Sequence, residues 1–582
     1  MERRHRPICC SSSHARALQL CLLAVLLASA LLGCRVVRGS SDRGEPAVAE
    51  VEEAAATADP WVRGDLPPAA LTGKPRHGGQ VVSVITTDPP SLNTLVDSDW
   101  IASRITDHRV YESLVGNDPY DEPRYQIVPE LAERWDVAPD LKTYTFHLRR
   151  GVKWHDGKPF TSQDVVATFD KVQNEKTKAV HIRAYTKELE RYEALDEHTV
   201  RFSFAKPYFL IMDGIFAEIP IQPAHVIAEL SGAEYNEAAS NPLNRHPIGT
   251  GPFRFQEWRS AQKIVIERNN GYWGKKPYLD RVVFRIVKDS TVAYQLAERE
   301  EVDVVSVTSE QWRKMGQAIR EDYYRTKHYD NNYSWIGWNL RRPFFKDVRV
   351  RRALTMLINR PGIIRAMFYG LPRETTCHFY WAGESCDQTV EPLPYDPAAA
   401  VRLLEEAGWV DRNGDGVRER QGIDFRFRFM IPAGSETAAR MITKVKEDFE
   451  RAGIDLQLHR VEWSAFVKQL RDKEFDACTL AWGSSSPRGD PTQIWHSDSI
   501  EGGSNYISFS NARADQLMSQ ARVTLDEVRR NDLYRELHRL LYAAQPYTWL
   551  YVNPRLSLIH RRVHGVRQSL VGWQYEDWWV EP

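Results

Sequence analysis

The chain has 582 residues, which is too long for one hydrophobic core, so we expect two or three domains. Its 77 lysines and arginines balance 78 aspartates and glutamates, and this balance gives no electrostatic reason to propose a nucleic acid as a partner. The 18 tryptophans and 24 tyrosines are a heavy aromatic load. Many will be core residues, but flat amphipathic rings also suit a site that holds varied ligands.

The first residues have the features of an export signal. Several arginines precede an apolar run from Ala17 to Leu32, and Leu31 to Cys34 then reads as a lipobox, whose cysteine is lipidated and becomes the mature N-terminus. A transmembrane anchor is the alternative, although the run is short for a bilayer span. We therefore expect a lipoprotein signal peptide over residues 1–34, with Cys34 lipidated and the protein anchored to a membrane of the cell envelope. Residues 35–77, rich in Ala, Glu, Pro and Gly, predict a flexible tether.

Only three cysteines follow the leader: Cys377, Cys386 and Cys478. No CxxC or Cys/His spacing indicates a metal site, and we expect no cofactor. So few cysteines fit an exported protein with at most one disulfide. Cys377 and Cys386 are close together in a loop-like stretch, so they either form that disulfide or remain free, and Cys478 is expected to be a buried thiol.

The folded part is expected to begin near Gly78. Alternating apolar and polar residues, or short β-rich runs between turn residues, predict strands. In the first half of the chain these are expected at 81–85, 143–148, 199–204, 253–258, 263–268 and 282–287, with 253–268 forming a hairpin.

The turn at His155-Asp156 has a catalytic and a structural interpretation. A hydrolase could use the two side chains as a pair, but neighbours in sequence rarely face one another. The run from His155 to Lys158 has turn chemistry, and Thr161 after it is suited to cap a helix. We therefore predict a surface turn that joins strand to helix.

The second half of the chain alternates helices with strands. Asp347 and Asp396 are expected to cap helices, and strands are expected at 425–430, 455–463 and 475–482. Pro546 to Leu558 predicts one returning strand, and the aromatic tail from Trp573 to Val580 is expected to pack back on the first part of the chain. The run from Asp411 to Gly416 resembles the start of a calcium loop, but Gly422 stands where the final carboxylate is required, so a tight turn is preferred.

Four blocks occur in the order found in one known family. They are the run Thr143 to Val165, PIGTGPF at 247–253, DVRVRRAL at 347–354, and YDP with LLEEAGW within 395–409. From about residue 78 to its end, the chain resembles the bacterial extracellular solute-binding proteins of family 5, the oligopeptide and dipeptide class. The resemblance implies an α/β fold of two lobes that close on a ligand like a clamp, with the first lobe split into two subdomains.

The resemblance also implies domain boundaries and a function. The first lobe would span 78–332 and the second 333–550, with 551–582 returning to the first lobe, so the chain would cross between lobes near Asn332 and Tyr551. The protein would be a monomeric periplasmic receptor for a peptide or similar solute, which it delivers to an ABC permease driven by an ATPase. A nickel complex or an oligosaccharide as ligand, or a sensory receptor without transport, are alternatives. A secreted hydrolase is a further class, but the chain lacks GxSxG and HExxH.

Ligand-binding residues follow from the resemblance one at a time. Peptide-binding members have a cleft tryptophan after the Glu-Trp of a strand, which falls on Trp463, preceded here by Glu462. A second cleft tryptophan falls on Trp482, although Ala481 replaces the usual glycine. Around Trp482 and Gly483 the family lays an extended peptide beside a strand, main chain to main chain.

An aspartate three residues after the second tryptophan pairs with the ligand's α-ammonium in these members, and that position here is Ser485. Either Asp490 replaces the missing carboxylate, or the ligand offers no free ammonium in the cleft, which we favour because Asp490 precedes Pro491 and suits a helix cap. Four more residues are weaker candidates for ligand contact: Thr250, Gly251, Asn332 and Tyr333.

Overall fold

The computed structural model describes residues 74–581 except 98, 122–124, 184, 485, 487, 568, 570 and 571. Contacts divide the chain into 1–58 and 59–582, and every described residue belongs to the second unit. Cys34 and the predicted signal peptide lie outside the described residues. Within the described ranges, no helix combines the length and the apolar character that crossing a bilayer requires.

A seven-stranded sheet gathers strands from both ends of the chain. Its order is β12 (Tyr323–His328), β21 (Arg555–His560), β11 (Val304–Ser306), β1 (Gln80–Ile85), β10 (Arg281–Ile286), β9 (Lys263–Arg268) and β8 (Phe253–Arg259). The strands predicted at 81–85 and 282–287 and the hairpin at 253–268 are confirmed to within one residue. Helices α3 (Trp100–Thr106), α8 (Ser290–Glu298), α9 (Ser309–Arg313) and α10 (Gln317–Asp322) accompany this sheet. The aromatic tail packs into its core through Tyr575 and Trp578, as expected.

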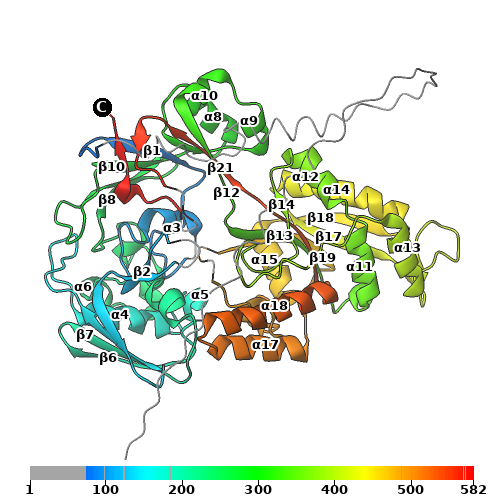
Figure 1. The fold of residues 1–582 in the computed structure, drawn as a ribbon, viewed down its shortest axis with the longest axis horizontal. Coiled ribbons are helices and arrows are strands. Elements are labelled where there is room, and N and C mark those ends of the chain that lie inside the picture. The colour runs from blue at the N-terminus through cyan, green and yellow to red at the C-terminus, as the bar shows by residue number, and fades with distance from the viewer. Residues whose placement is uncertain are drawn as a thin grey trace, which may run out of the picture. The chain divides into compact units, whose positions relative to one another are not determined.

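A four-stranded sheet forms a second body beside the first (Figure 1). Its order is β4 (Ala132–Val137), β5 (Thr143–Leu148), β7 (Thr199–Phe204) and β6 (Leu189–Asp196), and α4 (Ser162–Gln173) packs on it. Strand β5 buries every second side chain, as its alternation predicts. Thr161 caps α4 as predicted, because its hydroxyl accepts from the Gln163 N–H while the Asp164 carboxylate accepts from the Thr161 N–H at 2.7 Å.

A six-stranded sheet organises the middle of the chain. Its order is β14 (Arg373–Glu374), β20 (Tyr547–Val552), β13 (Asn331–Trp338), β19 (Ala477–Ser484), β17 (Arg426–Pro432) and β18 (Asp455–Val461). Phe427 and Phe429 point to one core, while Met430 points to another. The first face is covered by α11 (Val348–Met356), α12 (Arg360–Phe368), α13 (Pro397–Glu406) and α14 (Glu436–Arg451), the second by α15 (Trp463–Asp472), α17 (Ala512–Val523) and α18 (Glu527–Ala544) (Figure 1).

Shorter elements connect these layers. They include β2 (Val115–Asn117), β3 (Ile127–Pro129), α5 (Val180–Arg183), the π-helix η2 (Ile211–Phe216), α6 (Ala224–Ile227), α7 (Gly232–Asn236), β15 (Glu419–Arg420), β16 (Ile423–Asp424), α16 (Thr492–Trp495), β22 (Val563–His564) and β23 (Trp579–Val580). We call the seven- and four-stranded sheets with their helices the first lobe, and the six-stranded sheet with its helices the second lobe.

The chain crosses between the two lobes twice, between β12 and β13 and between β20 and β21. The prediction of one strand over Pro546 to Leu558 is wrong, because two strands of different sheets occupy that stretch. Pro554 lies between them, and a residue without an N–H interrupts a ladder. The two connections lie side by side, since Asn332 Nδ2 donates to the Asn553 carbonyl at 3.1 Å and Asn553 N donates to Asn332 Oδ1 at 3.2 Å.

The Asp411 stretch is a turn between α13 and β15, as preferred. The two carboxylate oxygens of Asp411 accept from the Gly414 and Gly416 N–H groups at 2.7 and 3.0 Å. Both glycines have positive φ, at 76° and 87°, which suits a tight turn.

The structure pairs Cys377 with Cys386 as a disulfide whose Cα atoms are 6.0 Å apart, and it buries Cys478 as a free thiol. In protein that begins after Cys34, alkylation under non-reducing denaturing conditions should therefore label one cysteine, and three after reduction. Opening so short a loop should cost roughly 2–3 kcal/mol on the loop-entropy account. Labelling of all three thiols without reductant would contradict the pairing.

Candidate ligand cavity between the two lobes

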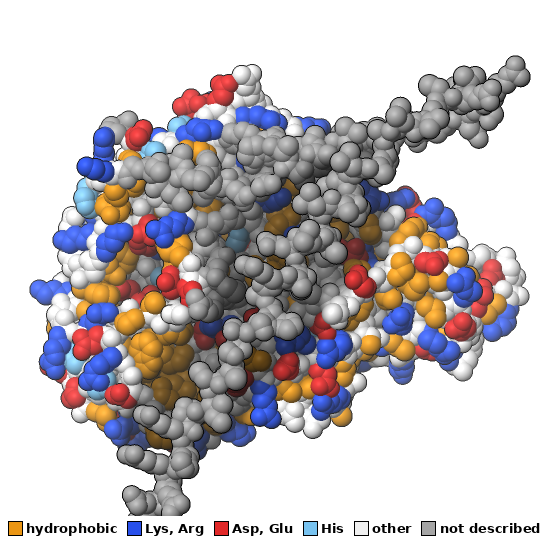
Figure 2. Space-filling view, in the orientation of Figure 1, with side chains coloured by type: hydrophobic (Ala, Val, Ile, Leu, Met, Phe, Trp, Pro, Cys, Tyr) orange, Lys and Arg blue, Asp and Glu red, His pale blue; other side chains and the backbone are white. Residues whose placement is uncertain are grey.

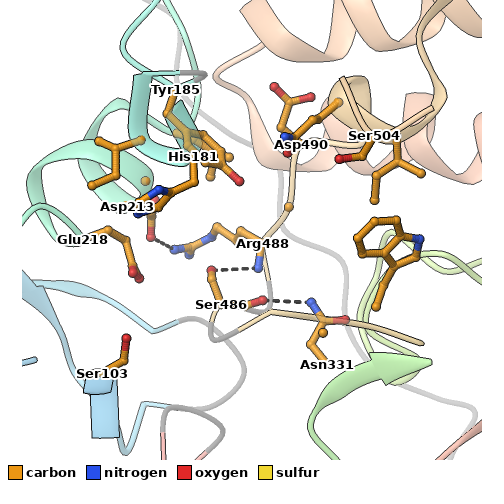
Figure 3. A pocket seen from close by; sticks show the side chains of 18 of the residues that line it. Ser103, His181, Tyr185, Asp213, Glu218, Asn331, Ser486, Arg488, Asp490 and Ser504 are labelled. Carbon is orange, nitrogen blue, oxygen red and sulfur yellow. Dashed lines mark hydrogen bonds and ion pairs between the residues drawn. The ribbon is translucent and has the colours of Figure 1, made fainter. Parts of the chain in front are cut away.

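A cavity of about 430 Å³ lies between the lobes, with walls of different chemistry. The first lobe contributes mainly residues from 94–107 and 181–220, and the second contributes residues of β13, β19 and the loops that follow Arg373–Glu374 and β19. Figure 3 shows these side chains converging from the two sides. On the outer face shown in Figure 2, basic and acidic side chains are interspersed, which agrees with the balanced composition.

The second-lobe wall is aromatic. The Trp482 ring stacks between Trp335 and Tyr506, with ring centroids 5.8 and 6.0 Å away. Beside it the Tyr333 hydroxyl and His378 Nδ1 are 2.6 Å apart. Burial lowers the pKa of His378 to about 3, so this histidine brings no positive charge to the cavity at neutral pH. This wall is lined by the aromatic residues Tyr333, Phe379 and Trp482, with Arg488 and Asp490 beside them.

Strand β19 presents a partly unpaired edge at this wall. Strand β13 pairs with it along its whole length, from Ala477 to Ser484. On the other side β17 pairs with it only at Ala477 and Cys478. Within the described residues, the stretch from Thr479 to Ser484 thus has a strand neighbour on one side only. An extended chain of suitable length could add its main-chain hydrogen bonds to such an edge.

The first-lobe wall carries several carboxylates, and most have partners. Asp107 accepts from the Thr94 and Thr106 hydroxyls at 3.0 and 3.1 Å. Glu130, behind the wall, pairs with His108 Nδ1 at 2.7 Å. Burial opposes the charge on His108, but this ion pair outweighs it and raises the pKa of the imidazole to about 9.

Asp213 and Glu218 are close in sequence but differ in whether their carboxyl groups have partners. Asp213 Oδ1 accepts from Arg488 of the second lobe at 2.6 Å, across the cavity (Figure 3). Glu218 lines the cavity with an exposed side chain and forms no hydrogen bond or ion pair with any residue that the structure describes. Desolvation by the protein around its carboxyl group raises the pKa of Glu218 to about 7. Sequence reasoning missed both Glu218 and Arg488, and the available signal was a single glutamate inside the apolar run 214–221.

A second contact between the lobes uses Asp490. Its carboxylate accepts from the Tyr208 hydroxyl of the first lobe at 3.0 Å and lies 3.5 Å from Arg522 of its own lobe. The same carboxylate accepts from the Thr492 N–H at 2.9 Å, at the start of α16. Because its side chain is only 7% exposed, Asp490 is committed to these partners in this structure.

Four of the predicted ligand-binding residues come together at the cavity. Trp482, Gly483, Asp490 and Tyr333 all line it. Ser485 lies outside the described residues.

The other predicted residues lie elsewhere. Trp463, at the start of α15, is 54% exposed, stacks on Phe466 and does not line the cavity. Asn332 is used at the crossing, and its neighbour Asn331 lines the cavity instead. Thr250 is buried and Gly251 hydrogen-bonds the Val110 carbonyl through its N–H, so both belong to a packed loop behind the wall.

His155 fastens that same loop, and its structural interpretation fits the geometry. Its Nδ1 accepts from the Gly249 N–H at 3.1 Å, and its Nε2 lies 3.1 Å from the Gly251 carbonyl. Asp156 pairs with His225 at 2.7 Å rather than with His155. The two neighbours thus point to different partners, which gives no support to a catalytic pair.

Comparison with known proteins gives consistent results. The family described as bacterial extracellular solute-binding proteins, family 5 Middle, matches residues 126–503. The oligopeptide-binding protein AppA of Bacillus subtilis is 29% identical over 528 residues, which cover 87% of this chain and 93% of that protein. The dipeptide-binding protein of Escherichia coli is 27% identical over 462 residues, covering 76% and 83%.

Solved structures share the fold. AppA of Bacillus subtilis in complex with a nonapeptide superposes with a TM-score of 0.75 at 27% identity, covering 88% of this chain and 100% of that one. NikZ of Campylobacter jejuni in complex with Ni(L-His) gives 0.73 at 20% identity, covering 86% and 99%, which shows the fold alone. With the three sheets, these likenesses confirm the predicted α/β clamp of two lobes with a split first lobe.

Proposed function

We propose, from the premise that this chain belongs to the bacterial extracellular solute-binding proteins of family 5, that it binds a peptide or peptide-like solute between its lobes for an ABC importer. The solute would be handed to a membrane permease driven by an ATPase. Relatives that are named as peptide-binding proteins, among them the two described above, support a peptide as the class of ligand.

The single observation that carries the peptide proposal is the partly unpaired edge of β19 beside Trp482. Main-chain pairing reads no side chains, so such an edge suits ligands of varied sequence. An aromatic wall beside it gives apolar contact without demanding one shape. A nickel complex needs no strand edge, and for this reason we rank that alternative second.

The test is a calorimetric measurement of direct binding, with alanine di-, tri-, tetra- and nonapeptides as probes. Quenching or enhancement of tryptophan fluorescence gives a second readout, because Trp482 lies in the wall. Binding of at least one length at micromolar concentration supports the proposal. If no length binds while Ni²⁺ with histidine does, the nickel alternative replaces it.

Lipid anchoring is part of the proposal and rests on the Leu31 to Cys34 box. Replacing Cys34 by serine removes the thiol that accepts the lipid, so the variant should leave the membrane pellet almost completely and appear in the soluble fraction of the cell envelope. The measurement is fractionation with immunoblotting, and Cys21→Ser in the same leader is the matched control. A Cys34→Ser protein that still pellets as fully as wild type would require another anchor.

A further inference from the structure

One acidic group in the cavity forms no hydrogen bond or ion pair with any residue that the structure describes. Of the carboxylates on or behind the first-lobe wall, Asp107 has two hydroxyl donors, Glu130 has His108 and Asp213 has Arg488. Glu218 has no such partner among the described residues, although protein surrounds it closely enough to raise its pKa to about 7. Because Glu218 is exposed to the cavity, a solute bound there can reach its carboxylate directly.

The backbone fixes where Glu218 points. Its neighbours Ala217 and Ile219 are 0% and 1% exposed, and their N–H groups donate to carbonyls of η2 at 2.9 and 3.0 Å. With both flanking side chains held in the core, the glutamate between them is directed into the cavity beside Asp213 (Figure 3). The position is therefore built by the fold and is not a chance orientation of a surface side chain.

Within the described residues, no charged group that lines the cavity pairs directly with Glu218. Burial lowers the pKa of His181 and His378, so both imidazoles are neutral near pH 7. Arg488 is engaged by Asp213. The neighbouring Asp107 and Asp213 further raise the pKa of Glu218, and only His108 opposes them. Among the described residues, the first-lobe wall thus presents Glu218 as an unpaired carboxyl group opposite the aromatic wall.

We propose that this cavity selects solutes that carry a cationic group, an ammonium or a guanidinium, and that Glu218 of the first lobe is the counter-charge that holds it. This inference rests on the proposed function and names the charge of its ligand. It revises the expectation of a ligand without a free ammonium, because the carboxylate absent at position 485 would be supplied from the opposite lobe. A ligand held by β19 on one side and Glu218 on the other would bind both lobes, which favours the closed state.

The cation could be the ligand's α-ammonium or a basic side chain, and three peptides separate these sources. They are the alanine peptide of the length that binds most tightly, its N-acetylated form, and the N-acetylated form with one alanine replaced by lysine. Each is titrated calorimetrically into wild type, Glu218→Gln and Glu229→Gln. Glu229 is an exposed glutamate of the same lobe outside the cavity lining, so its variant controls for a change of net charge.

We expect at least one cationic peptide to bind wild type about 30-fold or more tightly than the neutral peptide, and Glu218→Gln to abolish that difference. If acetylation weakens binding and the added lysine does not restore it, the α-ammonium is the cation. If the added lysine restores tight binding, a basic side chain can supply the cation. Circular dichroism and thermal unfolding of Glu218→Gln, compared with wild type and Glu229→Gln, show whether the variant is folded.

Two results would overturn the inference while leaving the peptide function intact. The neutral peptide could bind wild type as tightly as the cationic ones, or Glu218→Gln could retain the full preference for the cation. Failure of every peptide, neutral or cationic, would instead overturn the proposed function and this inference with it.

Discussion

Gly249→Ala should lower the melting temperature of the first lobe by at least about 6 °C or prevent its folding. A Cβ at this position would lie 1.6 Å from the Val110 carbonyl oxygen and 2.4 Å from its carbon. Both are backbone atoms, so a change of rotamer cannot relieve the clash and the loop must move. We estimate that the substitution lowers the free energy of unfolding by about 3 kcal/mol or more. For a body of this size, each kcal/mol lowers the melting temperature by roughly 2–4 °C.

The same loop supports the cavity wall, which makes the effect functional as well. Gly249 and His155 exchange two hydrogen bonds, at 2.8 and 3.1 Å, and the segment that the loop touches follows Asp107 of the wall. Thermal unfolding followed by circular dichroism and fluorescence measures the loss. Gly434→Ala is the control, because an added Cβ there meets nothing within 4 Å and φ is not positive. A Gly249→Ala protein that melts with wild type would show that the loop can move at little cost.

Local patterns predicted the elements well, since their signals are complete within a few residues. The alternation of β5 and the cap at Thr161 each depend on neighbours in sequence, and both were predicted correctly. The prediction of a single strand over Pro546 to Leu558 was wrong, because apolar residues continue on both sides of Pro554 and resemble one unbroken strand. The family resemblance implied a crossing near Tyr551, but the division into two strands depends on partners far away in sequence and could not be read from this segment alone.

The candidate site could be predicted only in part. Trp482 and Gly483 were carried over from the family and do line the cavity, whereas Trp463, carried over in the same way, does not. Glu218 gave no motif, since its importance depends on which carboxylates find partners after folding. A residue defined by the absence of a partner is visible only when all of its neighbours are placed.

Asp490→Asn should weaken binding of every ligand by a similar factor, about 5- to 100-fold, because Asp490 joins the lobes in this structure. Its two oxygens accept from the Tyr208 hydroxyl and the Thr492 N–H, and one of them forms an ion pair with Arg522 at 3.5 Å. An asparagine has one acceptor, and its amide would turn N–H donors toward other donors. Loss of this contact should destabilise the closed state by about 1–3 kcal/mol without removing a contact to the ligand. A smaller population of the closed, binding-competent state lowers the apparent affinity for every ligand by the same factor.

Small-angle scattering with calorimetry separates this role from ligand anchoring. Wild type should show a smaller radius of gyration with peptide than without, and Asp490→Asn should need more peptide to reach it. Asp498→Asn is the matched control, since that side chain of the same lobe is 93% exposed. If Asp490→Asn instead weakens only peptides with a free α-ammonium, Asp490 anchors the ligand, and the charge assigned to Glu218 belongs there. Equal weakening of free and acetylated peptides leaves Asp490 as a contact between lobes, whose strength sets how far a ligand must favour closure.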